Sequence, residues 1–262
     1  MTSHFITFAA NDGKNSYPEI YKASERLQKQ AKKSNLFDTI IEYTEKDLQA
    51  DKYFWPKHEQ FIKNNPKGFG WWFWKPYIIK KRLEQIKEGD VLTYLDCGCE
   101  IVPRFFNKKD NFVSEIQASQ LQAYPESIQR HCKHYTKQIC YDFFNASESE
   151  MLDNGFYYEA NRIFLVKNNL TKKIIDEWWT VLDAHYELHD NSKTTAPENS
   201  TFHETRGDQM IFNFILFKNK LLNSETRRKS NVPVGFEAWR NKTGQSKLCE
   251  NHPSCICGCC VI

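Results

Sequence analysis

The alternation of apolar and polar residues predicts that the chain opens with a strand, a helix and a second strand. HFITFAA (4–10) and LFDTIIEYT (36–44) are mostly apolar runs of the length of buried strands. Between them, YPEIYKASERLQKQAKKS (17–34) spaces apolar residues near the helical period, which is typical of an amphipathic helix. This order is that of a βαβ unit, which favours a parallel sheet covered by helices.

The same kind of pattern predicts further elements along the chain. The segment 76–89 begins with proline and ends with glycine, the usual residues at a helix start and stop, and DVLTYLD (90–96) follows it as a third strand. Residues 155–168 read as another strand, and residues 169–189 and 208–220 as helices.

The remaining segments carry weaker patterns. Residues 45–65 are expected to be helical, 104–150 to form short helices and loops, and 190–208 to form a long polar loop. We therefore predict one α/β domain over residues 1–245, with a mostly parallel central sheet and helices on both faces. A flexible, cysteine-rich tail is expected over residues 246–262.

Composition narrows the function classes. The chain has 262 residues with 40% hydrophobic and 26% charged residues, as in soluble globular proteins. The formal net charge of +3 is too small to indicate nucleic acid binding. Aromatic residues make up 15%, a high share, which indicates an aromatic core and, for a minority of the rings, a cleft that stacks on a sugar or a base.

The cellular compartment is predicted from the N-terminus and the cysteines. MTSHFITFAAND has no basic start and no long apolar core, so we do not expect a signal peptide, and no run of eighteen apolar residues occurs. Five of the nine cysteines lie between Cys249 and Cys260. Without a secretion signal, this crowding favours a reducing cytosol over a disulfide framework.

The stretch YLDCGCE (94–100) is the first candidate for chemistry. Asp96 ends a predicted strand, and Glu100 lies four residues on, past Gly98, which lets the chain turn. Ligands of open α/β sheets bind beyond the carboxyl ends of strands, and Mg²⁺ or Mn²⁺ prefers carboxylate oxygens completed by phosphates. The alternative is an ordinary turn aspartate. Cys97 and Cys99 lack the second pair that a zinc site needs, which favours small buried thiols.

The block GFGWWFWKPYIIKKRLEQIKEGDVLTYLDCGCEI (68–101) closely resembles a family of glycosyltransferases of bacteria and large DNA viruses. The pattern shared with that family is glycine and aromatic residues, Trp-Lys-Pro, a helix, and then a YLD-x-GCE motif. Residues 134–144, 157–168, 174–179 and 203–215 follow in the family's order, the last of these with a specific motif. The resemblance implies a GT-A-like fold, in which a DxD motif holds a divalent metal against a nucleotide sugar.

The resemblance also implies roles for individual residues. Asp96 matches the first acid of the DxD-like motif, but Gly98 stands where a strict motif has its second acid, so Glu100 and His203 are the other expected ligands of Mn²⁺ or Mg²⁺. Lys75, Trp74 and Arg206 are expected to bind the donor. Lys75 could instead be a solvated helix-start lysine, and His203 an ordinary loop histidine.

Asp208 and Gln209 are the expected catalytic residues. In the resemblance, Asp208 faces the anomeric carbon or the acceptor hydroxyl, whereas the ordinary interpretation makes it a helix N-cap. The expected function is transfer of a sugar from a nucleotide-sugar donor to a glycan, protein or lipid acceptor, with metal assistance. The alternative is a non-catalytic GT-A-like domain that binds a glycan or a protein partner at a membrane.

The last four residues, Cys259-Cys260-Val261-Ile262, fit a prenylation motif. Prenylated Cys259, with Cys257 and Cys260 as palmitoylation candidates and basic residues upstream, would provide the two signals that stable anchoring requires. We therefore expect a cytoplasmic protein that binds peripherally to the cytosolic face of a membrane. The alternative is a tail of thiols that binds metal.

Overall fold

A five-stranded sheet forms the centre of the molecule, in the order β2-β1-β3-β6-β5. The computed structural model describes residues 1–11, 17–103, 106–125, 132–153, 157–194, 197–222 and 235–248. The strands are β1 (Ser3–Ala9), β2 (Thr39–Thr44), β3 (Val91–Leu95), β5 (Leu121–Pro125) and β6 (Tyr158–Val166). Four of the five point the same way, because β1 pairs in parallel with β2 and β3, while β6 is antiparallel to β3 and β5. The predicted α/β class with a mostly parallel sheet is confirmed.

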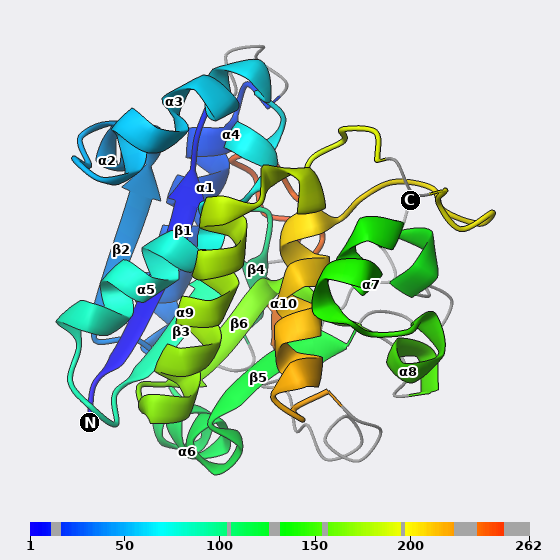
Figure 1. Ribbon diagram of the computed structural model, residues 1–262. Coiled ribbons are helices and arrows are strands. Elements are labelled where there is room, and N and C mark those ends of the chain that lie inside the picture. The colour runs from blue at the N-terminus through cyan, green and yellow to red at the C-terminus, as the bar shows by residue number, and fades with distance from the viewer. Residues whose placement is uncertain are drawn as a thin grey trace.

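Helices cover both faces of the sheet (Figure 1). Successive side chains on a strand point to opposite faces. Accordingly, Phe5 and Val91 pack in a cluster with two helices, whereas their neighbours Ile6 and Leu92 pack in a larger cluster whose longest helices are four others. The first pair is α1 (Ile20–Ser34) and α6 (Lys109–Ser119), and the second group is α3 (Phe54–Asn64), α5 (Lys75–Gln85), α9 (Asn169–Ala184) and α10 (Gly207–Lys218).

A small second sheet lies outside the central one. Its two strands, β4 (Glu100–Ile101) and β7 (Phe236–Glu237), pair antiparallel, which returns the chain to the turn that follows β3. We call residues 235–248 the strap. The other elements are α2 (Glu45–Gln49), α4 (Gly68–Trp71), α7 (Gln138–Phe144), α8 (Glu148–Asp153) and the 3₁₀ turns Cys132–His134 and Tyr186–Leu188.

The structure differs from the predicted elements in several places, and strands β4 and β7 were not expected. Strand β5 falls in a region where only short helices and loops were expected, because LQAYP is too short to show an alternating pattern. Helix α5 ends at Gln85 because Ile86 is extended, and α9 ends at Ala184 because His185 leaves the helical region. Within the described residues, no helix is both long and apolar enough to cross a membrane.

Candidate active site

A cavity of about 350 Å³ opens at the carboxyl ends of β1 and β3. Ligands of open α/β sheets bind at this end of the strands. Four segments form most of the wall: residues 67–75, the turn 96–99 after β3, residues 204–209 and the strap. The predicted site residues that line the cavity are Trp74, Lys75, Asp96, Arg206, Asp208 and Gln209.

Lys75 lies in the cavity wall between two carboxylates. Its Nζ donates to Asp208 Oδ2 at 2.8 Å and lies 3.5 Å from Asp96 Oδ1. The side chains of Lys75 and Asp208 are only 4% and 9% exposed, whereas that of Asp96 is 26% exposed. The Tyr94 hydroxyl donates to Asp96 Oδ1 at 2.5 Å. Lys75 is therefore not a solvated surface lysine, and Asp96 is the more open of its two carboxylate partners.

Burial and charge act against each other in this group. Burial alone would lower the pKa of Lys75, but the carboxylates of Asp208 and Asp96 outweigh it and raise that pKa. Burial raises the pKa of Asp208 above its usual value, and the nearby Lys75 ammonium offsets only part of this rise. The Lys75 ammonium therefore stays charged. Burial makes the Asp208 carboxylate more basic than an exposed aspartate.

Two contacts fix the position of Asp208 at the start of α10. A Cβ on the preceding residue, Gly207, would lie 2.2 Å from the Cα of His189, so only glycine lets the helix approach this closely. The indole N–H of Trp178 donates to the backbone oxygen of Asp208 at 3.0 Å. Asp208 lies inside the first turn of α10, after the N-cap Arg206. The N-cap role considered for Asp208 is therefore wrong.

The aromatic loop before α5 has an unusual backbone. Phe69, Trp71 and Trp72 have φ values of 54°, 58° and 61°, in the left-handed region that costs a non-glycine residue energy. Gly68 and Gly70, at 60° and 87°, share this region. The half-buried Trp71 and Trp72 line the cavity. Strain of this kind is often retained where a loop shapes a binding site.

Trp74 holds this loop in place as well as lining the cavity. Its ring stacks on Phe8 with centroids 3.7 Å apart, and its indole N–H donates to the Gly68 oxygen at 3.0 Å. The residue is 3% exposed. One face of the ring is therefore covered by Phe8 and is not available to a donor.

Arg206 and Gln209 present polar groups from either side of Asp208. The Arg206 guanidinium lies 4.1 Å from the centre of the Tyr135 ring and 3.8 Å from a Glu204 carboxylate oxygen. The Gln209 Nε2 is buried and has no hydrogen-bond partner within the part of the chain that the structure describes. This amide can therefore donate to a ligand in the cavity.

The strap contributes two cationic residues, Arg240 and Lys242, that the sequence analysis did not place in the site. Burial alone would lower the pKa of Lys242, but Cys97 and Asp96 outweigh it and raise that pKa, so the amine stays charged. The only signal for Arg240 and Lys242 in the sequence is the basic character of the C-terminal segment, which by itself predicts contact with anionic lipid.

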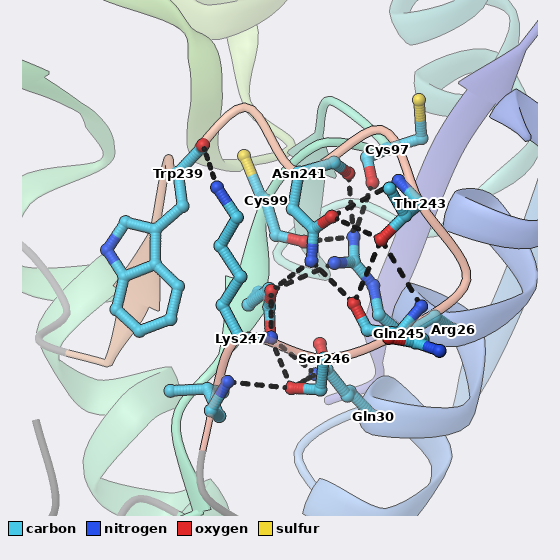
Figure 2. Close-up of polar contacts among 12 residues, drawn as sticks. Arg26, Gln30, Cys97, Cys99, Trp239, Asn241, Thr243, Gln245, Ser246 and Lys247 are labelled. Carbon is cyan, nitrogen blue, oxygen red and sulfur yellow. Dashed lines mark hydrogen bonds and ion pairs between the residues drawn. The ribbon is translucent and has the colours of Figure 1, made fainter. Parts of the chain in front are cut away.

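Glu100 does not join Asp96 at the cavity. It is 0% exposed and accepts from Arg26 at 2.9 Å, from Asn241 at 2.6 Å and from Ser246 at 2.5 Å. Figure 2 shows the strap folded over Arg26, with Asn241 and Ser246 on the inner side of the loop. Because its oxygens are occupied in this cluster, Glu100 is not placed to act with Asp96 as a metal ligand.

His203 also lies apart from Asp96. It is exposed, does not line the cavity and packs against His134 with ring centroids 5.2 Å apart. Over the described ranges, no group of three His, Cys, Asp or Glu side chains is arranged to hold a metal ion. The expected set of Asp96, Glu100 and His203 therefore does not fit a shared metal ion in this structure.

The structure tests only some of the predictions for the cysteines. Cys97 and Cys99 are buried and free, and burial raises the pKa of both thiols, so they are the small buried thiols that the sequence favoured. The three lipidation candidates, Cys257, Cys259 and Cys260, lie outside the described residues. The described fold continues to Leu248, three residues beyond the boundary predicted at residue 245.

Two solved structures are similar to this chain over most of its length. Mouse xyloside xylosyltransferase 1, in its apo form, is 13% identical with a TM-score of 0.45, and the match covers 85% of this chain and 84% of that one. The galactosyltransferase LgtC, in complex with donor and acceptor sugar analogs, is 11% identical with a TM-score of 0.43, covering 89% and 85%. Both TM-scores are below 0.5, so neither similarity carries an assignment. No family model and no curated protein matches the chain.

Proposed function

We propose that this protein is a glycosyltransferase that uses a nucleoside-diphosphate sugar as its donor. The observation that carries the proposal is the charge pattern of the cavity at the carboxyl ends of β1 and β3. Five cationic side chains line it, from Lys67, Lys75, Arg206, Arg240 and Lys242, against three acidic ones, from Asp96, Glu204 and Asp208. An excess of cations around a few carboxylates suits a ligand that combines a diphosphate with sugar hydroxyls.

The groups in the cavity match the steps of glycosyl transfer. The bond between the anomeric carbon and the diphosphate oxygen breaks, and the leaving diphosphate takes the electron pair. Fixed cations stabilise the charge that develops on it. The acceptor oxygen bonds to the anomeric carbon and gives up its proton, for which the more basic carboxylate of Asp208 is the candidate.

The aromatic wall supports a carbohydrate ligand. Trp71 and Trp72 line the cavity from the strained loop, and Tyr17, which is 42% exposed, also lines it. Aromatic rings present an apolar face together with a polar edge, as sugar rings do. The transferred sugar and the acceptor are therefore expected to contact these rings, while the cations bind the diphosphate.

The direct test is a screen of thermal stability with UDP-, GDP- and CMP-sugars, with Mn²⁺, with Mg²⁺ and with EDTA. A ligand that binds only the folded protein raises its stability by mass action. We expect a UDP- or GDP-sugar to raise the Tm, followed by measurable donor hydrolysis. A CMP-sugar carries a single phosphate, so a response to CMP-sugars alone would contradict a diphosphate donor. A nucleotide sugar that binds but is neither hydrolysed nor transferred would favour the non-catalytic alternative. The EDTA arm tests the predicted use of a metal, since Asp96 is the expected ligand that lines the cavity.

A further inference from the structure

One buried carboxylate, that of Glu100, accepts several hydrogen bonds from the strap. Of the groups that donate to Glu100, three belong to the strap: the Asn241 amide at 2.6 Å, the Ser246 hydroxyl at 2.5 Å and the Lys247 backbone N–H at 3.0 Å. The domain supplies Arg26 at 2.9 Å and Gln30 at 3.1 Å. Glu100 therefore links α1 to the strap.

Arg26 completes this link through backbone oxygens. Its guanidinium donates to Cys97 at 2.9 Å and Cys99 at 3.1 Å in the turn after β3, and to Asn241 at 3.2 Å in the strap. The side chains of Arg26 and Glu100 are 5% and 0% exposed. A buried charge that loses its partner is costly, so removing the Glu100 charge should loosen the turn and the strap together.

Gly98 provides a further contact with the strap. Its backbone oxygen accepts from the Asn241 N–H at 2.9 Å. A Cβ at this position would lie 3.2 Å from the Arg240 Cα and 3.4 Å from the Asn241 nitrogen, both backbone atoms of the strap. The position where a strict DxD motif carries its second acid is therefore covered by the strap, and a side chain there would require the strap backbone to move by a few tenths of an ångström.

The docked strap places two cations in the cavity wall. Arg240 and Lys242 flank Asn241, the residue held by both Glu100 and Gly98. The Lys242 Nζ lies 5.4 Å from the centre of the Tyr17 ring, and no carboxylate in the described part of the chain forms an ion pair with it. By contrast, Lys75 is occupied by Asp208 and Asp96.

We propose that Glu100 is a positioning residue, which together with Gly98 docks the strap so that Lys242 and Arg240 bind the donor's diphosphate. The proposal rests on the proposed function. It assigns diphosphate binding to the strap and leaves Lys75 to orient the two carboxylates. Glu100 then acts on the ligand only through the strap, without touching it.

Pyrophosphate is the probe for this proposal, with its Kd measured by calorimetry on the full chain. Lys242→Met should weaken binding about tenfold, the effect expected for one charged hydrogen bond. Lys29→Met removes an equal charge from an exposed position on α1, outside the cavity, and should leave the Kd unchanged. An unchanged Kd in Lys242→Met would overturn the proposal.

The positioning role is tested by combining variants. Glu100→Gln should also weaken pyrophosphate binding and should speed hydrogen exchange of the Asn241 and Lys247 amides without ligand. In the Lys242→Met, Arg240→Met background it should cause no further loss of affinity, because interacting sites are non-additive. Two results would overturn the role of Glu100. One is that Glu100→Gln weakens pyrophosphate binding equally in that background and in the wild type. The other is that Glu100→Gln alone speeds hydrogen exchange but leaves the Kd for pyrophosphate unchanged.

Gly98→Ala tests the same role without disturbing a buried charge. Its added methyl group should displace the strap and reproduce both effects, and it replaces Glu100→Gln if that variant does not fold. Failure of the two proposals can be told apart. If the wild type binds pyrophosphate but no nucleotide sugar, the glycosyltransferase proposal fails alone. If it transfers sugar but Lys242→Met binds pyrophosphate normally, the strap proposal fails alone.

Discussion

Asp96 and Asp208 flank the same ammonium but differ in access to water. Asp96 is the more open of the two and is held by Tyr94. We predict that Asp96→Asn lowers transferase activity by about 100-fold, the scale of losing one preorganised electrostatic contact, while the Tm changes little. Donor hydrolysis and thermal melts measure the two effects. Asp176→Asn, at an exposed site on α9, is the matched control. Wild-type activity in Asp96→Asn would show that the Asp96 carboxylate is not needed for the reaction.

Lys75 is predicted to matter for stability as well as activity. Lys75→Met leaves Asp208 buried without its cation, and breaking a buried pair in this way costs about 3 kcal/mol. Denaturant melts should therefore show a large loss in the free energy of unfolding.

A double variant separates the lost charge pair from lost packing. Lys75→Met with Asp208→Asn removes both charges, so it should recover at least about 1 kcal/mol relative to Lys75→Met while remaining inactive. If the double variant is no more stable than Lys75→Met, packing around Lys75 explains the loss.

At the scale of elements, the approach of α10 to His189, which follows the 3₁₀ turn Tyr186–Leu188, depends on Gly207. We predict that Gly207→Ala costs about 3 kcal/mol, because its methyl group would overlap the His189 backbone, and that it also lowers activity by moving Asp208. Gly89→Ala is the comparison: its Cβ meets nothing within 4 Å, and only its φ of +86° opposes the change, at about 1 kcal/mol. Equal losses in the two variants would contradict a tight contact at Gly207.

Elements with a long periodic pattern were predictable from the sequence, and short ones were not. The first strand, helix and strand are present near their expected bounds, because each has a clear apolar face or run. Strand β5 and the two-residue strands β4 and β7 have no such pattern and form only because distant segments pair with them. Local periodicity carries no information about such partners.

Part of the candidate site was predictable from the motifs on which the family resemblance rests. Lys75, Asp96 and Asp208 stand in recognisable motifs at the ends of strong elements, and the structure brings them together. Glu100 shares a motif with Asp96, but the orientation of its side chain depends on the strap. The strap lies about 140 residues further along the chain. The lysine at position 242 has no motif of its own.

At the scale of the whole molecule, the two fully buried histidines, His58 and His189, should make stability depend on pH. Burial lowers the pKa of His58 to about 4 and that of His189 to about 3. Both are below the unfolded value of about 6.5, so the unfolded chain binds more protons below that pH. Stability should be complete above about pH 6.5 and should fall between about pH 6 and 4, by up to roughly 1.4 kcal/mol per pH unit for each histidine.

Denaturant melts at pH 7, 6 and 5 measure this slope. His189→Phe keeps an aromatic ring beside Phe73, with which His189 stacks, but cannot take up a proton. It should reduce the slope by about half. A slope equal to that of the wild type would show that acid destabilises the protein through other groups.

The position of the strap in the chain also sets the order in which the protein can be assembled during synthesis. All five strands of the central sheet, and α10, precede residue 219, whereas Asn241 and Lys242 follow it. A chain emerging from the ribosome can therefore complete its core before the last wall of the cavity exists. Until residues 240–247 have emerged, Glu100 has, within the described part of the chain, only Arg26 and Gln30 of α1 as partners, and Arg26 has only Glu100 and the turn after β3. The nascent protein is then folded but not yet able to enclose a ligand.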